Sequence, residues 1–260
     1  MGIHFAIAQI ISGGVLAWLM QISGLGEQAY YQYAIVLTGI TAILAFIPAV
    51  YFYKKDHFAR VYGGMIPEKN GSRLCQKEMI LLLLMGGGLA IYGNLLVNLL
   101  HFFMEMSEYQ ELMSQITQGK SLLMMIFWMG IVAPTAEEGI FRWLVYLRLR
   151  DYLKSVKAAA VISAVIFGVY HGNLLQAIYA SVLGFFFAMI LEKTGSLLSC
   201  VLLHAGANLT SILVSESAAV TDPEKIFPYL SLFIVAVMAA AVGGIWYYFG
   251  KRKDNKSRLL

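Results

Sequence analysis

Long apolar segments constrain the fold of this chain more than any other feature. A membrane-spanning helix needs about 20 mostly apolar residues, because the hydrocarbon core is about 30 Å thick and each helical residue adds about 1.5 Å. Eight segments of this kind lie near residues 3–21, 31–53, 79–103, 121–147, 158–171, 174–191, 197–214 and 226–248. The fifth is short for a span. We predict an all-α polytopic membrane protein, with a single integral-membrane domain over residues 1–260.

The composition agrees with a membrane protein. Of the 260 residues, 59% are hydrophobic and 13% are charged, whereas a soluble domain carries about 25% charged residues. This excludes an ordinary cytosolic enzyme and a disordered chain, and two cysteines do not make a disulfide framework. The first apolar segment lacks a basic leader and a small-residue cleavage site, so we expect a retained helix rather than a signal peptide.

The distribution of Lys and Arg predicts the orientation of the helices. Basic residues concentrate in residues 54–78, 148–157 and 251–260, whereas the loops on the opposite side hold only Lys120 and Lys225. Short cytoplasmic loops are enriched in Lys and Arg. Both termini are therefore predicted to lie in the cytoplasm. The net charge of +4 follows from this topology, so we expect a lipid bilayer as the environment and no nucleic-acid partner.

The apolar segment at residues 121–147 contains charged residues, although the bilayer makes an ionised side chain there unfavourable in free energy. An ionised side chain at the bilayer centre costs at least about 2.5–3.5 kcal/mol. Arg142 follows Glu138 by four residues, so the two share a helical face and can pair. Glu137 points about 100° away around the helix. It is left without a local partner, which favours a function for it. Pro134 is predicted to kink the helix one turn earlier.

Two further pairs of residues lie on later apolar segments. Phe167 and His171 are four residues apart, as are His204 and Asn208. Counted from the basic ends of their helices at about 1.5 Å per residue, Glu137 lies about 20 Å deep, His171 about 21 Å, His204 about 14 Å and Asn208 about 20 Å. Taken alone, each histidine would be interpreted as an interior residue whose hydrogen bonds are made within the protein. Because the four groups reach a similar depth on three helices, we predict that they form one site.

A carboxylate with two imidazoles is suited to the activation of water. A glutamate in apolar surroundings becomes a better general base near neutral pH. A histidine can hold the water or protonate a leaving amine, and a histidine with an asparagine can donate hydrogen bonds to a tetrahedral oxyanion. The sequence lacks the Gly-x-Ser-x-Gly motif of a serine nucleophile, and neither cysteine lies in these motifs. We therefore expect peptide-bond hydrolysis without a covalent intermediate.

The motifs occur in the order Glu137-Glu138-x-x-x-Arg142, Phe167-x-x-x-His171 and His204-x-x-x-Asn208. This ordered set resembles the signature of the CPBP family of intramembrane proteases. That family includes CAAX prenyl endopeptidases of the Rce type and the bacterial Abi group of proteases and immunity proteins related to bacteriocin processing. The resemblance covers residues 121–214, which we expect to form the catalytic core.

The resemblance implies a role for each matching residue. Glu137 resembles the glutamate that activates water, and His171 the histidine that assists it. His204 and Asn208 resemble the residues that stabilise the oxyanion.

Three more residues, Glu138, Arg142 and Phe167, take supporting positions in this resemblance. Trp143 departs from the family pattern, in which many members have a small residue after the arginine, and it could narrow the groove beside the site.

The sequence leaves the role of a metal ion open. Glu137, His171 and His204 would make a two-histidine, one-glutamate set like that of catalytic zinc sites, with a fourth position for water. The motifs lack the His-Glu-x-x-His arrangement of many zinc proteases. We expect no obligatory cofactor, with zinc as the possible metal.

Three functions are compatible with these observations. The first is an intramembrane endopeptidase that cleaves a short peptide or a membrane-anchored, lipid-anchored precursor in a bacterial plasma membrane, with roles such as bacteriocin or pheromone maturation or self-immunity. The second is a non-proteolytic scaffold or immunity protein that binds a peptide or a membrane partner. The third is a small transporter with a buried proton relay, which predicts inverted repeats that the sequence does not contain.

Overall fold

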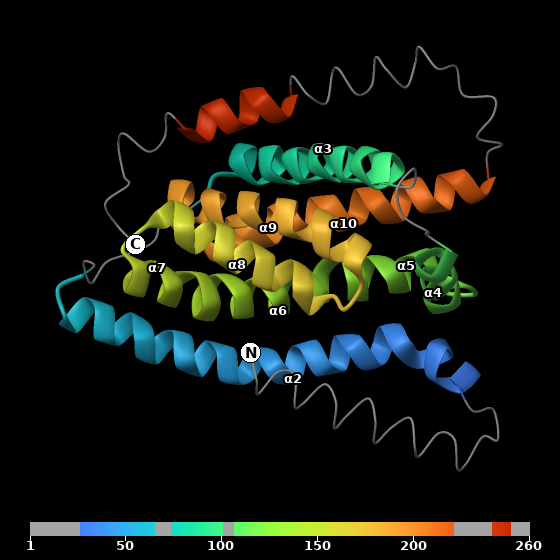
Figure 1. The fold of residues 1–260 in the computed structure, drawn as a ribbon, viewed down its shortest axis with the longest axis horizontal. Coiled ribbons are helices and arrows are strands. Elements are labelled where there is room, and N and C mark those ends of the chain that lie inside the picture. Colours follow the sequence, from blue (N-terminus) through green and yellow to red (C-terminus); the bar gives the residue numbers. More distant parts are fainter. Residues whose placement is uncertain (1–26, 66–73, 101–106, 221–240, 251–260) are drawn as a thin grey trace.

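The computed structural model of the protein describes residues 27–65, 74–100, 107–220 and 241–250. All regular secondary structure in these ranges is helical, as predicted (Figure 1). The first predicted segment lies outside the described residues, and so does most of the eighth. The helices are α2 (Glu27–Tyr62), α3 (Gln76–Leu100), α4 (Ser107–Thr117), α5 (Leu122–Met125), α6 (Ala133–Glu138), α7 (Leu147–Leu153), α8 (Val156–Tyr170), α9 (Leu174–Thr194) and α10 (Leu197–Val220).

Five described helical stretches are long and apolar enough to cross a membrane. They are Tyr33–Tyr62, Gln76–Val97, Leu122–Leu153, Leu174–Thr194 and Leu197–Glu216. They match five of the predicted segments, so the chain is a multi-pass membrane protein. The segment predicted at 158–171 forms α8, whose 15 residues are fewer than a span requires. The total of eight helices and the cytoplasmic location of both termini remain predictions.

The helix over residues 122–153 lies between α2 on one side and the α8, α9 and α10 layer on the other (Figure 1). It is built from α5, α6 and α7 with two π-helical segments between them, η1 (Ile126–Val132) and η2 (Gly139–Tyr146). α8 and α9 form an antiparallel hairpin. The hairpin turn begins at His171, and the Asn173 side chain accepts hydrogen bonds from the first backbone N–H groups of α9. This turn places His171 directly after Tyr170, the last residue of the short helix α8.

α3 packs against α10 at backbone contact distance. A Cβ atom added to Gly86 would overlap the carbonyl of Leu203, and one added to Gly206 would overlap the carbonyl of Leu83. These two glycines therefore allow the close approach, in agreement with the general preference for small residues at membrane helix contacts. Gly93, on the same helix, has open space around it.

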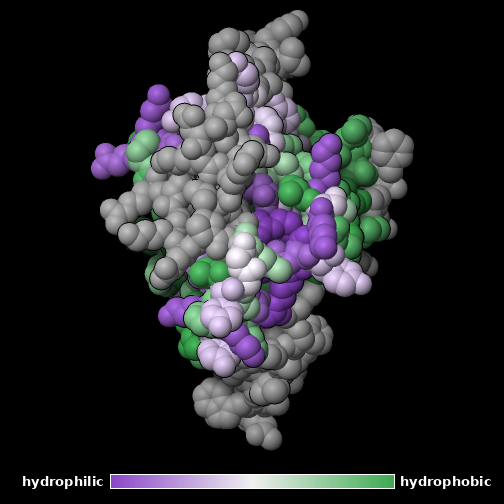
Figure 2. All heavy atoms as spheres, turned by 90° about the vertical axis from the view of Figure 1, so that its left-hand side faces the viewer, coloured by the Kyte–Doolittle hydropathy of each residue, from purple (hydrophilic) through white to green (hydrophobic). Residues whose placement is uncertain are grey.

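Hydrophilic side chains gather at the end of the bundle where α2 and α7 end (Figure 2). Three ion pairs join the helices here: Arg60 with Asp151 at 2.6 Å, Arg150 with Glu192 at 3.0 Å, and Arg148 with Asp56 at 2.6 Å. The described basic residues of segments 54–78 and 148–157 thus meet at one end of the molecule, whereas the exposed side chains of α8 after Lys157 are apolar.

Candidate active site

The helix that carries the two glutamates changes its winding around them. η1 precedes α6 and η2 follows it. Pro134 lies near the start of α6 and has no N–H to donate. The sequence predicted a kink at this proline, and the structure shows that the hydrogen bonding changes from π-helical to α-helical here. π-helical turns inside α-helices are frequent at functional sites. They alter which way the residues after them face, so the direction of Glu137 could not be read from a regular helix.

Glu138 and Arg142 form the predicted ion pair. Arg142 Nε donates to Glu138 Oε2 at 2.6 Å, and Arg142 Nη2 lies 3.4 Å from Glu138 Oε1. Both side chains are 0% exposed. A buried charge is tolerated only when it is paired and its remaining polar atoms are hydrogen-bonded. Ser163 on α8 provides one such bond, because its hydroxyl accepts from Arg142 Nη1 at 3.3 Å.

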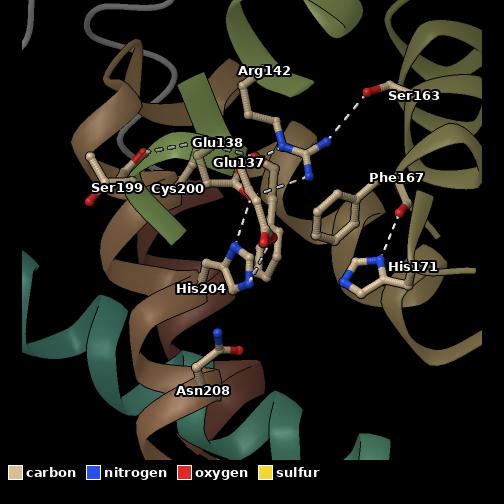
Figure 3. Close-up of polar contacts among 12 residues, drawn as sticks. Glu137, Glu138, Arg142, Ser163, Phe167, His171, Ser199, Cys200, His204 and Asn208 are labelled. Atoms are coloured by element: carbon tan, nitrogen blue, oxygen red, sulfur yellow. Dashed lines mark hydrogen bonds and ion pairs between the residues drawn. The ribbon is translucent and has the colours of Figure 1, made fainter. Parts of the chain in front are cut away.

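His204 lies between the two glutamates (Figure 3). Its Nδ1 is 3.0 Å from Glu138 Oε1, and its Nε2 is 3.8 Å from Glu137 Oε2. Because an ionised carboxylate only accepts hydrogen bonds, Nδ1 carries the proton in the bond to Glu138. The ring is thereby oriented so that Nε2 faces Glu137. Glu138 therefore acts on His204 as well as on Arg142, a link between α6 and α10 that the sequence did not indicate.

Aromatic rings surround the charged groups. Arg142 lies over the faces of Phe167, at 5.1 Å, and Phe187, at 5.5 Å. Phe187 also stacks on His204 with the ring centres 4.8 Å apart. A cation over an aromatic face is stabilised electrostatically, more strongly when water is excluded. Phe167 of α8 and Phe187 of α9 thus both pack against the charged groups.

His171 approaches the same aromatic ring from α8. The ring centres of Phe167 and His171 are 5.0 Å apart, and those of Phe167 and His204 are 5.7 Å apart. His171 Nδ1 bonds to the backbone carbonyl of Phe167 at 2.9 Å. A carbonyl can only accept, so Nδ1 is protonated and Nε2 of the neutral ring is the acceptor. Both imidazoles thus contact one phenyl ring, and the second nitrogen of His171 is available to hold a water molecule.

Asn208 lies one helical turn after His204 on α10, on the same side (Figure 3). Its Nδ2 donates to the backbone carbonyl of Met129 in η1 at 2.8 Å. One of its two amide hydrogens is used in this bond. The other remains to be donated elsewhere. The structure thus links Glu137 directly to His204, and connects His171 and Asn208 to that pair through Phe167 and α10 respectively.

The described residues do not assemble a metal site. No group of three or more His, Cys, Asp or Glu side chains within the described ranges is arranged to hold a metal ion. In the set Glu137, His171 and His204, one nitrogen of each histidine is already used in a hydrogen bond, and His204 Nε2 faces the Glu137 carboxylate. These hydrogen bonds are compatible with zinc, because a zinc-ligating histidine usually donates its second N–H to a carboxylate or a carbonyl. The three side chains nevertheless do not form a group that could hold one metal ion in the form observed, so no chemical step is derived from one.

Two residues of the site were missed by sequence reasoning, and a third has a different role. Ser163 and Phe187 belong to no motif, and a serine or a phenylalanine in an apolar helix carries no signal of its own. Trp143 was expected to narrow the groove beside the site. It instead stacks on Tyr53 and Phe46 of α2, with ring centres 4.0 Å and 6.0 Å away. It therefore fastens the helix that carries the glutamates to α2.

Among known proteins, part of the chain is similar to one family. No curated protein matches the chain, and no solved structure does. Residues 119–210 match a family model described as type II CAAX prenyl endopeptidase Rce1-like. This range contains all three motifs. It supports an intramembrane endopeptidase in general terms. The resemblance inferred from the three motifs is thus confirmed over residues 119–210, which are similar to Rce1-like type II CAAX prenyl endopeptidases.

Proposed function

We propose that this protein is an intramembrane endopeptidase in which Glu137 activates the water that hydrolyses a peptide bond. The observation that carries the proposal is the difference between the two glutamates. Glu138 is fully buried and bonded to Arg142 and His204, whereas the Glu137 side chain is 19% exposed and faces His204 Nε2. Glu137 is therefore the carboxylate that a water molecule can reach.

The proposed reaction follows from the positions of these groups. Glu137 takes a proton from water while His171 Nε2 holds the same water, and the resulting hydroxide adds to the carbonyl carbon of the substrate. The oxyanion accepts hydrogen bonds from the remaining Asn208 Nδ2 hydrogen and from Nε2–H of His204, whose ring is then doubly protonated because its Nδ1–H is donated to Glu138. Protonated Glu137 then transfers its proton to the leaving amine as the C–N bond breaks. One donor to an oxyanion is worth roughly 2.7–4 kcal/mol.

The proposed substrate is a short peptide or a membrane-anchored, lipid-anchored precursor in a bacterial plasma membrane. Peptide maturation, such as that of a bacteriocin or a pheromone, and self-immunity are the roles we favour. The apolar outer surface and the depth of the site support a substrate that is already associated with the membrane. Glu137, His171, His204 and Asn208 are the proposed catalytic residues, with Glu138, Arg142 and Phe167 supporting them.

The first experiment compares membranes that contain wild-type protein or Glu137→Gln at equal expression. Small peptides and membrane-anchored precursors are followed by mass spectrometry, with and without a chelator. We expect cleavage products that are lost in Glu137→Gln, because an amide cannot accept the proton of water. We also expect these products to persist in the chelator. Glu111→Gln is the matched control, since Glu111 is exposed on α4 and accepts a hydrogen bond from Gln115 on the same helix.

Two results would contradict the proposal. Equal processing of a native precursor by wild type and Glu137→Gln would favour a protein that binds a peptide without cleaving it. Loss of cleavage in the chelator would instead restore a metal-dependent mechanism, with Glu137, His171 and His204 rearranged around zinc.

A further inference from the structure

The bond between Asn208 and Met129 exists because of the hydrogen-bonding pattern around Pro134. At the end of η1 the hydrogen bonding is π-helical, because Ala133 N–H donates to the Trp128 carbonyl, five residues earlier. The next donor in that register would be residue 134, directed at the Met129 carbonyl. Residue 134 is proline and has no N–H. The π-helical register therefore ends at this position.

The Met129 carbonyl is thereby left without a backbone donor. Ala133, the donor in an α-helical register, is used by Trp128, and Pro134, the donor in a π-helical register, has none to give. A buried carbonyl without a partner is unfavourable, so such groups are almost always satisfied by a side chain or water. Here the Asn208 amide of α10 donates to it at 2.8 Å.

Close packing brings the two helices together at this bond. A Cβ atom added to Gly130 would lie 2.7 Å from Leu209 Cδ2, so the glycine next to Met129 allows α10 to approach η1. Asn208 and Leu209 are neighbours on α10, and they contact the neighbouring residues Met129 and Gly130. The asparagine amide is therefore held on the same helix that carries Glu137.

We propose that Pro134 is a positioning residue for catalysis: by removing the backbone donor of the Met129 carbonyl, it creates the acceptor that fixes the Asn208 amide. One Nδ2 hydrogen is anchored on Met129, and the other is held in a set direction for the oxyanion. The inference rests on the proposed function, because it assigns Asn208 to the oxyanion. It adds a residue that contacts neither water nor substrate.

The anchor is tested without any substrate. Protein labelled with ¹⁵N-asparagine is studied by NMR in detergent, and the Asn208 amide is assigned by its loss in Asn208→Asp. We expect one Nδ2 proton of the wild type to be shifted downfield and protected from solvent exchange relative to the other. Pro134→Ala restores the missing N–H, so the downfield shift and the protection of that proton should both decrease. An unchanged Asn208 signal in Pro134→Ala would overturn the inference.

A matched control distinguishes this role from a general effect of removing a helical proline. Pro48 also lies inside a helix, α2, so Pro48→Ala makes the same chemical change away from Asn208 and should leave its signal unchanged. Pro134→Ser restores the same N–H, and it replaces Pro134→Ala in the experiment if Pro134→Ala does not fold. The wild-type spectrum needs neither variant, and an Asn208 amide with the chemical shifts and the fast solvent exchange of an exposed asparagine would contradict the anchor.

The catalytic consequence is measured on whichever peptide wild-type membranes cleave and Glu137→Gln membranes do not. We expect Pro134→Ala to lower kcat about ten-fold with little change in KM, less than the roughly 10²–10³-fold loss caused by removing an oxyanion donor altogether. In an Asn208→Ala background, the same substitution should add less than about two-fold, because residues that act through one another are not additive.

The outcomes separate this inference from the proposed function. An anchored Asn208 amide in a protein that cleaves nothing counts against the proposed function. If the wild-type protein cleaves peptides but its Asn208 signal is unchanged in Pro134→Ala, the role of Pro134 is contradicted. A full additional loss in the Asn208→Ala background would also contradict it, because Pro134 would then act by another route.

Discussion

Adjacent residues in this site have very different surroundings. Glu138 is enclosed by Arg142, His204 and the rings of α8 and α9, whereas Glu137 is partly exposed and lies 3.8 Å from His204 Nε2. Adjacent positions on a helix point about 100° apart. One glutamate is thus structural and the other is accessible to water, although their chemistry is the same.

Removal of Arg142 should destabilise the protein strongly. Arg142→Leu leaves the Glu138 carboxylate buried without its cation, and breaking a buried pair in this way costs about 3–5 kcal/mol. We expect a lower free energy of unfolding in detergent, measured by chemical denaturation. Arg148→Leu is the control, because the Arg148 side chain is 50% exposed and pairs with Asp56 at the surface. Surface pairs contribute about 0–1 kcal/mol.

The double variant Glu138→Gln with Arg142→Leu should recover part of the lost stability, since it removes the unpaired charge. It should not recover activity, because His204 would lose the carboxylate that orients it. A double variant as unstable as Arg142→Leu alone would mean that the packing of the arginine, rather than its charge, accounts for the effect.

At the scale of elements, two contacts hold the site together. α10, which carries His204 and Asn208, lies directly against the backbone of α3 through Gly86 and Gly206. The helix with the glutamates is fastened to α2 by Trp143, which stacks on Tyr53. Since the reacting groups come from different helices, the distance between them depends on these contacts.

Gly86→Val should separate α3 from α10. The added side chain would overlap the Leu203 carbonyl, which belongs to the helix backbone and cannot move aside. We expect a loss of stability of about 1–3 kcal/mol or more, as for overpacked cores, together with reduced activity. Gly93→Val is the matched control, because nothing lies within 4 Å of the added Cβ. Thermal unfolding of both variants in detergent checks this, and equal melting temperatures would contradict the close packing.

At the scale of the whole molecule, charge and apolar surface define an orientation. The ion pairs of Arg60, Arg148 and Arg150 lie at one end of the bundle, and the helices between the two ends expose apolar side chains. Basic residues favour the cytoplasmic side. The turn between α4 and α5, which contains Gln118, lies at the opposite end (Figure 1).

Cysteine labelling tests the predicted orientation. In cells that express the protein, a membrane-impermeant maleimide should label Gln118→Cys but not Lys157→Cys, since both positions are exposed but at opposite ends. Both variants are made with Cys75→Ser, because Cys75 is exposed, while Cys200 is buried. Labelling of Lys157→Cys but not of Gln118→Cys would show that the orientation is opposite to the predicted one. The native Cys75, at the start of α3, should behave as Lys157→Cys does.

Local patterns in the sequence were sufficient for part of this description. Apolar runs of about 20 residues identified the spanning helices, because the thickness of the bilayer sets their length. The spacing of four residues predicted the pair of Glu138 and Arg142, because side chains at that spacing share a face. The three motifs indicated the similarity to Rce1-like endopeptidases that the family model finds over residues 119–210. Each of these features depends on residues that are close together in the chain.

The tertiary structure alone decided how these local features meet. Glu138 bonds to His204, which lies 66 positions later, and Arg142 bonds to Ser163, which lies 21 positions later. Asn208 reaches the carbonyl that Pro134 leaves without a donor. Such contacts depend on the tilt and rotation of each helix and on the π-helical turns that change its phase. These are set by packing against other helices, through close contacts such as that of Gly86 with Leu203, and no pattern of spacing along one helix contains that information.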